Sequence, residues 1–279
     1  MSQPIRLEFL STGTVRIRPL MRSQPAGGYS ILRRLRAILD RGWTEPLPVG
    51  VFLIHHPEGI YLFDTGQPPR CNEPGYFPRT ALFNNMLRRF TLDNKDGIVA
   101  QLRERGIEPR DLKGVVISHL HNYHAGVLEE LVAAAPGLVV YVSREHWRAG
   151  FAPRIVGFQS GRPVGPWRGS YPLTEDGKVV VVDTSGHVPG HMSVVVYGGS
   201  NSSGGGGRQT TYMLPGDAAY GIDNLVKEEP DGISDDPLRA LETLRRIKEF
   251  ARGEEVVVLP SHDPDTLRIL AERAVYQPM

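Results

Sequence analysis

The sequence predicts an α/β protein in which a mixed or parallel sheet carries helices on its faces. Residues 114–143 show a strand–helix–strand order, because apolar, β-rich runs flank a segment with helical spacing. A hairpin is expected earlier, at residues 48–66, where two β-rich runs are separated by the turn sequence PEG. The chain has 279 residues, of which 40% are hydrophobic, so a large buried core and one or two domains are expected.

Apolar spacing places the elements of the first half of the chain. Ile98 and Leu102 have the spacing of a helix, and Gly106 is expected to end it. In chain order, we expect a strand pair at residues 5–19, the hairpin at 48–66, a helix within 93–112, a strand at 114–121, a helix at 124–137 and a strand at 138–143.

The second half begins with a segment that lacks clear periodicity. Residues 144–175 are rich in glycine, proline and aromatic residues, and we expect a loop-rich insertion there. Strands flank the sequence TSGHVPGH, and residues 198–207 are expected to form a flexible Gly/Ser hairpin tip. Because strands resume on both sides of that tip and no repeat is present, a single domain spanning residues 1–279 is predicted.

A helix is well marked at residues 235–253. Asp236 is expected to cap this helix and Pro237 to occupy its first position. The spacing of its apolar residues predicts a buried stripe formed by Leu238, Leu241, Leu244, Ile247 and Phe250. The last strand follows and runs toward His262.

Charge and composition exclude several classes of protein. The formal net charge is +1 and there is no basic stripe, so nucleic acid is not an expected partner. No apolar run approaches the roughly 20 residues that span a bilayer, and no signal peptide is recognisable, so no membrane association is expected. The single cysteine, Cys71, excludes an internal disulfide framework and makes the cytoplasm the default location.

Two further features each allow two interpretations. Residues 21–43 resemble a basic amphipathic helix, which could touch a membrane or a partner, although a surface helix with a solvated charged face is the more common case. The aromatic residues Trp147, Phe158 and Trp167 of the insertion could line a substrate pocket or pack beneath a loop.

Three histidines, His119, His121 and His124, fall within six residues at the end of a predicted strand. Alternate side chains of a strand share a face, so His119 and His121 are expected to project together. Three imidazole ligands that leave a position for water are typical of a catalytic metal site. A single buried histidine usually only packs or forms a hydrogen bond, but three at this spacing favour metal binding.

Other polar residues follow apolar β-runs farther along the chain. His187 and His191 lie in SGHVPGH, Asp217 lies in LPGDAAY, and His262 lies in LPSHD. Asp217 on its own could be a simple turn residue after Gly216. Since loops at one edge of a sheet can converge, we expect these side chains to share one site with the three histidines.

With its ordered motifs FDTG, SHLHNYHAG, TSGHVPGH, GDAAY and PSHD, the sequence resembles the metallo-β-lactamase superfamily from about residue 5 to residue 265. The hairpin before FDTG, the long segment before the histidines and the tyrosine in GDAAY are similar to the N-acyl homoserine lactone lactonases. The resemblance implies an αβ/βα four-layer sandwich. It also implies a centre with two metal ions that opens lactone rings.

The resemblance further implies roles for individual residues. One metal would be held by three histidines, a second by two, and Asp217 would bridge the metals. Asp64 would accept an N–H from a ligand histidine, and Tyr220 would point at the substrate carbonyl or the leaving oxygen. His191 matches a histidine that is not usually a ligand. The implied metal ligands are His119, His121, His124, His187, Asp217 and His262.

The sequence departs from the family pattern at Tyr123, where the motif HxHxDH carries an aspartate. Asn122 is one residue early and is not counted as a substitute. A phenol can bind a metal as phenolate, but its free pKa of about 10 makes a neutral proton donor the default. The predicted cofactor is therefore zinc, with one ion tightly bound and the second site weakened or empty. The implied catalytic residues are Tyr220, Asp217 and Tyr123.

The predicted function is a metal-dependent hydrolase that opens a small cyclic ester by attack of a metal-bound hydroxide. The alternatives are a lactam or cyclic carbamate hydrolase of detoxifying type, and a relative that binds metal without turnover. Thioester, phosphodiester or nuclease chemistry also occurs in the superfamily, but the net charge argues against nucleic acid. The expected partner is a small cyclic ester or amide. The sequence leaves the oligomeric state undetermined.

Overall fold

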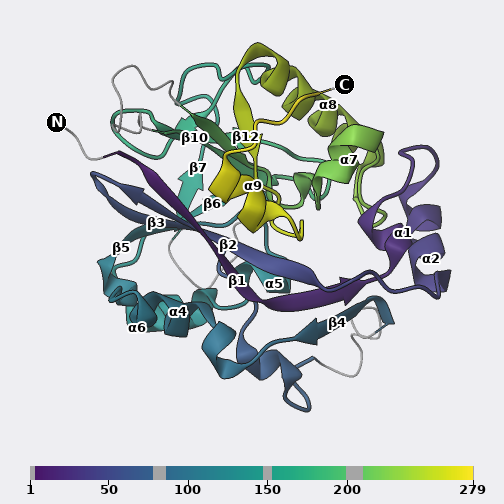
Figure 1. Ribbon diagram of the computed structural model, residues 1–279, viewed down its shortest axis with the longest axis horizontal. Coiled ribbons are helices and arrows are strands. Elements are labelled where there is room, and N and C mark those ends of the chain that lie inside the picture. The colour runs from purple at the N-terminus through teal and green to yellow at the C-terminus, as the bar shows by residue number, and fades with distance from the viewer. Residues whose placement is uncertain (1–3, 78–85, 147–152, 199–209, 279) are drawn as a thin grey trace.

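Two β-sheets pack face to face and carry helices on their outer faces in the computed structural model, which describes residues 4–77, 86–146, 153–198 and 210–278 (Figure 1). The first sheet contains, in spatial order, β4 (Arg88–Thr91), β1 (Arg6–Ile17), β2 (Leu47–His56), β3 (Gly59–Phe63), β5 (Leu112–Val116), β6 (Val140–Ser143) and β7 (Arg154–Val156). The second contains β12 (Val256–Val258), β11 (Thr211–Leu214), β10 (Met192–Tyr197), β9 (Val179–Asp183) and β8 (Tyr171–Pro172).

The helices are short except for one. They are α1 (Pro19–Arg22), α2 (Ser30–Leu39), α4 (Ile98–Glu104), α5 (Asn122–Ala125), α6 (Leu128–Ala134), α7 (Ile222–Lys227), α8 (Pro237–Gly253) and α9 (Thr266–Glu272). Within the described ranges, none of them is long and apolar enough to cross a membrane.

The layers follow from the two-residue period of the strands. In β2, Phe52 and Ile54 face the core between the two sheets, whereas Val51 and Leu53 face the helices on the outer side. That outer core includes Leu102 of α4 and residues of α6. A third core packs α8 against the outer face of the second sheet. The αβ/βα four-layer sandwich expected from the sequence is therefore confirmed. The core shared by both sheets supports the prediction of one domain.

Several predicted boundaries were wrong. The segment 5–19, expected to form a strand pair, contains one long strand, β1 (Arg6–Ile17), whose pairing with β2 shifts register between Ser11 and Thr14. The strand expected at 114–121 ends at Val116, because the chain turns toward the interior before the histidines. The helix expected at 124–137 is divided into α5 and α6. Gly106, with φ of +73°, follows α4 as predicted.

The insertion at 144–175 contains the short strands β7 and β8 as well as loops. Trp167 packs against Phe250 of α8, with ring centroids 5.6 Å apart, and its indole N–H donates to the Asp183 carbonyl. Phe158 and Trp167 line a cavity that contains none of the predicted metal ligands. Packing is therefore the better interpretation for Trp167, while Trp147 lies outside the described residues.

The predicted Gly/Ser tip, apart from Gly198, also lies outside the described residues. The flanking strands β10 and β11 pair antiparallel, as a hairpin requires.

Helix α8 begins as predicted, but its buried face is shifted. The Asp236 side chain accepts a hydrogen bond from the Arg239 N–H, and Pro237 occupies the first turn. Leu238 is 69% exposed and Leu241 is only partly buried. The stripe is completed instead by Ala240, Thr243, Lys248 and Ala251 together with the predicted Leu244, Ile247 and Phe250. The prediction differs because it included only large apolar residues, whereas small residues such as Ala240 and Ala251 are also buried on this face.

The basic amphipathic segment at residues 21–43 forms α1 and α2 at one edge of the molecule (Figure 1). Helix α2 lies at the surface, as predicted. However, the face that it buries consists of Arg33 and Ala37, and most of its large apolar side chains are exposed. The more common interpretation, a surface helix with a solvated charged face, therefore describes its position but not its exposed apolar side chains.

Candidate metal centre

The predicted site residues converge at one edge of the two sheets. Asp64 follows β3, the three clustered histidines follow β5, and His187 lies in the loop between β9 and β10. Asp217 follows β11 and His262 follows β12. Strands of both sheets therefore deliver side chains to a common point, as the sequence analysis expected from successive strand ends.

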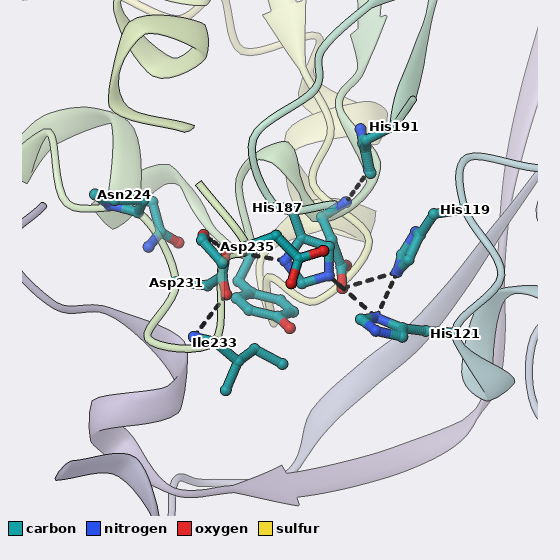
Figure 2. A network of polar contacts seen from close by, with 12 residues as sticks. His119, His121, His187, His191, Asn224, Asp231, Ile233 and Asp235 are labelled. Atoms are coloured by element: carbon teal, nitrogen blue, oxygen red, sulfur yellow. Dashed lines mark hydrogen bonds and ion pairs between the residues drawn. The ribbon is translucent and has the colours of Figure 1, made fainter. Parts of the chain in front are cut away.

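A first group of ligand atoms consists of three histidine nitrogens and one carboxylate oxygen. Nδ1 of His121 lies 2.8 Å from Nε2 of His119 and 3.1 Å from Nε2 of His187. Oδ2 of Asp217 lies 3.6 Å from the His119 nitrogen and 3.5 Å from the His187 nitrogen. Figure 2 shows the three rings turned toward one another. These four atoms have the separations and chemistry of a set that could hold one divalent cation.

A second group uses the other oxygen of the same carboxylate. Oδ1 of Asp217 lies 3.0 Å from Nε2 of His124 and 3.0 Å from Nε2 of His262, and these two nitrogens are 3.3 Å apart. All three residues are buried. The structure thus brings together the six ligands that the resemblance implies, with Asp217 between the two groups.

The outward Nδ1 atoms of four ligand histidines, His119, His124, His187 and His262, are engaged elsewhere, which leaves their inward nitrogens available to a cation. Nδ1 of His262 lies 2.7 Å from the Pro48 carbonyl oxygen, so it must carry the proton. Oδ1 of Asp217 is buried, and it lacks a hydrogen bond of acceptable geometry to any described residue although two nitrogens lie close to it. A buried carboxylate oxygen without such a donor facing imidazole nitrogens fits a metal centre.

Asp64 orients two of the ligands, one of them through Ser118. Its carboxylate accepts hydrogen bonds from the Ser118 N–H at 2.7 Å and hydroxyl at 2.9 Å, and from Nδ1 of His124 at 2.7 Å. The hydroxyl of Ser118 in turn lies 3.0 Å from Nδ1 of His119. Asp64 has φ of +64°, a conformation that costs energy for a non-glycine residue. Asp64 therefore carries local backbone strain. Its carboxylate fixes the tautomer of His124 directly and that of His119 through the serine hydroxyl.

Sequence reasoning missed the residue that orients His187. Nδ1 of His187 lies 2.9 Å from the carboxylate of Asp231, which also accepts bonds from Ile233 N–H and the Ser234 hydroxyl (Figure 2). Asp231 lies in the sequence PDG, which has the composition of an ordinary turn. Nothing local distinguishes it, because its role depends on the loop packing against His187 from 44 residues away.

The loop around Asp231 is itself held by a buried arginine of α2. The guanidinium of Arg33 donates to the carbonyl oxygen of Asp231 at 2.6 Å and to that of Pro230 at 3.3 Å. Arg33 is 0% exposed. Since its hydrogen bonds go to backbone carbonyls, Arg33 fixes the path of the loop, and through it the carboxylate that orients His187.

His191 lies beside the two groups but belongs to neither. Its Nε2 accepts a hydrogen bond from the Asp217 N–H at 3.1 Å, and its Nδ1 lies 2.8 Å from the Thr184 hydroxyl. Both ring nitrogens are used, which supports the structural role implied by the resemblance. Gly216, with φ of +56°, lets the chain turn tightly over the His191 ring just before Asp217.

Burial and neighbouring charges set the protonation states of the centre. Burial alone raises the pKa of Asp217, but the charges of His124 and His262 hold it well below its usual range. Burial lowers the pKa of His124, but the carboxylates of Asp217 and Asp64 outweigh it and raise that pKa to about 10. Burial also lowers the pKa of His119 and His121 well below the usual value. A cation at the second group would have to displace the proton of His124.

Two phenols lie against the bridging carboxylate. The hydroxyl of Tyr123 donates to Oδ2 of Asp217 at 3.1 Å and lies 3.1 Å from the hydroxyl of Tyr220. Burial, followed by the charge of Asp217, raises the pKa of both phenols above its ordinary value. Both are therefore neutral, which matches the default expected for Tyr123. The guanidinium of Arg88 lies 4.7 Å from the centre of the Tyr123 ring.

Solvent reaches the centre at His121, the one ligand that is only partly buried. One cavity there has a volume of about 570 Å³ and is lined by His119, Leu120 and His121 together with Val188. A second, of about 470 Å³, also contacts His121 and extends to apolar side chains of α2. A small molecule could therefore approach the ligand atoms from the α2 side of the molecule.

Comparison with known proteins gives the family of this architecture. Residues 44–262 match the family described as the metallo-beta-lactamase superfamily. The N-acyl homoserine lactonase AttM of Rhizobium radiobacter is 25% identical over 286 residues, covering 94% of each chain. The N-acyl homoserine lactonase AiiA of Bacillus thuringiensis subsp. kurstaki is 30% identical over 233 residues, covering 82% of this chain and 86% of that protein.

Solved structures show the same fold. A variant of AiiA from B. thuringiensis, with N-decanoyl-L-homoserine bound at its active site, superposes with a TM-score of 0.71. It is 25% identical, and the match covers 96% of each chain. The match to the family extends over most of the chain, including all six candidate ligands. This protein belongs to the metallo-beta-lactamase superfamily of hydrolases.

Proposed function

We propose that this protein hydrolyses the ring ester of a small lactone that carries an acyl side chain. The observation that supports this most directly is the convergence of two ligand groups and a neutral tyrosine, Tyr220, around one bridging carboxylate. The relatives AttM and AiiA are named N-acyl homoserine lactonases, which supports the choice of a lactone. The reaction adds water across the ester C–O bond and yields a hydroxy acid.

The donor set favours zinc, since imidazole and carboxylate ligands around compact positions suit that ion. When bound, such a cation polarises the carbonyl and lowers the pKa of water to about 7. The first group, with three histidines, would bind one ion tightly. The second would bind weakly, because neutral Tyr123 stands where the family pattern has an aspartate.

The protein's own residues supply the remaining chemistry. Tyr220, as a neutral phenol, can donate a hydrogen bond to the oxygen on which negative charge develops. Tyr123 links the hydroxyl of Tyr220 to Asp217 through contacts of 3.1 Å, so a proton can be held along this chain near the leaving oxygen. Asp217 stays ionised and contributes negative charge to both groups.

The cavity beside α2 supports a substrate with an aliphatic tail. Its volume is about 470 Å³, and it runs from His121 to Ile31, Leu35 and Ile38. A lactone whose ring lies at His121 would direct its acyl group along these side chains, which would remove apolar surface from water.

The single cysteine supports a reducing compartment, such as the cytoplasm, for this activity.

The decisive experiment measures the hydrolysis of N-acyl homoserine lactones by the purified, zinc-loaded protein. The release of protons is the readout. Acids form only when the ring opens, so the readout does not depend on the acyl chain. We expect turnover that a chelator abolishes and added zinc restores. Turnover that survives complete removal of the metal contradicts the proposal. So does the absence of turnover in a protein shown to hold zinc.

A lactam or cyclic carbamate is the second candidate, and Tyr123 is the observation that favours it. A leaving nitrogen needs a proton more than a leaving alkoxide does, and a buried neutral phenol is a suitable donor. The same assay with matched lactone and lactam rings separates the two candidates. Faster opening of the lactam would favour this second reaction.

A further inference from the structure

The outward face of α2 is apolar. Ile31, Leu35 and Leu39 follow one another at intervals of four residues and therefore form one stripe along the helix. Their side chains are 61%, 44% and 76% exposed, and Leu32 beside them is 46% exposed. The buried face of the same helix contains Arg33. The usual orientation of a surface amphipathic helix is thus reversed, and an apolar surface remains uncovered.

The surroundings of this stripe are strongly basic. Between residues 16 and 45 the chain has seven arginines and only two acidic residues, Asp40 and Glu45, although the whole chain has a formal net charge of +1. Asp40 is engaged, since its carboxylate accepts hydrogen bonds from the Leu20 and Gly42 N–H groups. Arg36 and Arg41 are exposed, and neither forms an ion pair with another described residue.

We propose that the outward face of α2, formed by Ile31, Leu32, Leu35 and Leu39 with Arg36 and Arg41 beside it, docks on an anionic lipid bilayer. An amphipathic helix in this position inserts its apolar side chains below the headgroups while its arginines contact the lipid phosphates. A second copy of this chain would cover the apolar stripe equally well, but it would bring two arginine-rich surfaces together. The charge therefore favours the bilayer.

The position of α2 gives this docking a consequence for substrate access. Ile31 and Leu35 line both the exposed stripe and the cavity that reaches His121. A bilayer in contact with α2 would therefore lie at the mouth of that cavity. An apolar molecule dissolved in the bilayer could then enter the cavity without first passing through bulk water. Docking itself requires no substrate, so it is independent of the proposed hydrolysis.

The test is co-sedimentation of the full chain with vesicles of phosphatidylcholine, with and without phosphatidylglycerol. We expect binding that requires phosphatidylglycerol and weakens as salt is added. The double variant Leu32→Asp with Leu39→Asp should bind these vesicles at least about tenfold more weakly, because two apolar side chains can no longer enter the bilayer. Neither residue lines a cavity at the metal centre. Arg36→Glu should lower binding about fivefold or more on anionic vesicles only.

Leu238→Asp and Leu267→Asp are matched controls, since these leucines are 69% and 61% exposed on α8 and α9. They should bind as the natural protein does. All variants should keep the thermal midpoint of the natural protein, which separates lost docking from lost folding. Equal binding to neutral vesicles, or no effect of the double variant, overturns the proposal. So does a dimer, seen by sedimentation equilibrium, that the double variant dissociates while neither protein binds vesicles.

Discussion

The two ligand groups share a carboxylate but differ in what surrounds it. The first group has a nitrogen of His121 within hydrogen-bond distance of the nitrogens of His119 and His187, and one oxygen of Asp217. The second has two histidine nitrogens and the other oxygen. The ring of Tyr123 lies beside both of these histidines, while its neutral hydroxyl donates to the Asp217 oxygen of the first group. Among the described residues, Asp217 is therefore the one carboxylate in the two groups, and it supplies one oxygen to each.

If both groups hold a cation, as we propose, this difference would let charge distinguish two neighbouring metal positions in one fold. Two divalent cations a few ångströms apart repel each other strongly, and anionic ligands offset that repulsion. In the proposed centre, a neutral phenol where the family pattern has a carboxylate would remove one negative charge from the second position. The histidines of the first group do not depend on that charge, so the asymmetry should appear in metal affinity before it appears in structure.

The largest effect is expected from breaking the first group with His119→Ala. The imidazole of His119 is one of only three histidine ligands there, and it is fully buried, so no other described side chain can replace it. We expect lactone hydrolysis to fall to background and the content of tightly bound metal to fall by one ion per chain. His55→Ala removes an imidazole from β2 outside the centre and should change neither. Full activity in His119→Ala would show that the first group is not the seat of the reaction.

The next largest effect is expected at Tyr220. Its hydroxyl contacts that of the other buried phenol, but it supplies no ligand atom. If its hydroxyl stabilises the developing oxyanion, Tyr220→Phe should lower kcat by roughly 10- to 1,000-fold, as loss of one such donor does. Metal content should stay the same. Tyr276→Phe is the matched control, because that hydroxyl is also buried but has no hydrogen-bond partner among the described residues. An unchanged kcat in Tyr220→Phe would leave Tyr220 with a packing role only.

A smaller effect is expected when the support of the first group is weakened by Asp231→Asn. The amide keeps the shape of the side chain but loses the charge that holds the proton on Nδ1 of His187. Loss of such a partner typically lowers metal affinity by about 10- to 100-fold. Titration with a competing chelator measures this, and zinc in excess should restore most of the activity. Asp223→Asn, at a partly buried ion pair with Arg22 outside both ligand groups, should leave the affinity unchanged.

The sequence was sufficient to predict much of this site because its ligands lie in short motifs at strand ends. His119, His121 and His124 are distinguished by spacing alone, and Asp217 and His262 follow apolar runs that could only be strands. The reason given for His119 and His121 was nevertheless wrong. They follow β5 in a turn and are not alternate residues of a strand. Hydrogen bonds from Ser118 to Asp64 and between Ser118 and His119 hold the start of this turn.

Interactions between distant loops could not be predicted in this way. Asp231 and Arg33 lie in a turn and in a helix, and neither segment has a pattern that points to the metal centre. The orientation of α2 was also beyond reach, since its apolar periodicity predicts a buried leucine stripe. Burial of Arg33 instead follows from four backbone carbonyls that receive its guanidinium, at residues 24, 25, 230 and 231.

The smallest but most informative effect is expected at Tyr123, the residue that makes the two groups unequal. Tyr123→Asp restores a carboxylate next to Asp217 and so adds the charge that a second cation requires. We expect the natural protein to retain one zinc ion after dialysis and the variant to retain close to two. The pH profile or the preference between lactone and lactam should change with it, because a neutral proton donor has been replaced by a carboxylate.

Tyr123→Phe separates charge from the loss of the hydroxyl. It removes the hydrogen bond to Asp217 but adds no negative charge, so its metal content should match that of the natural protein. If both variants gain a second ion, the phenol blocks the position by its bulk or its hydrogen bond, and charge is not the cause. If the natural protein already retains two ions, Asp217 alone offsets their repulsion or Tyr123 binds as phenolate. Because burial and Asp217 raise the pKa of Tyr123, a phenolate would require a bound cation to displace its proton. In that case the absorbance of tyrosinate should appear as zinc is added to the natural protein and should be absent from Tyr123→Phe.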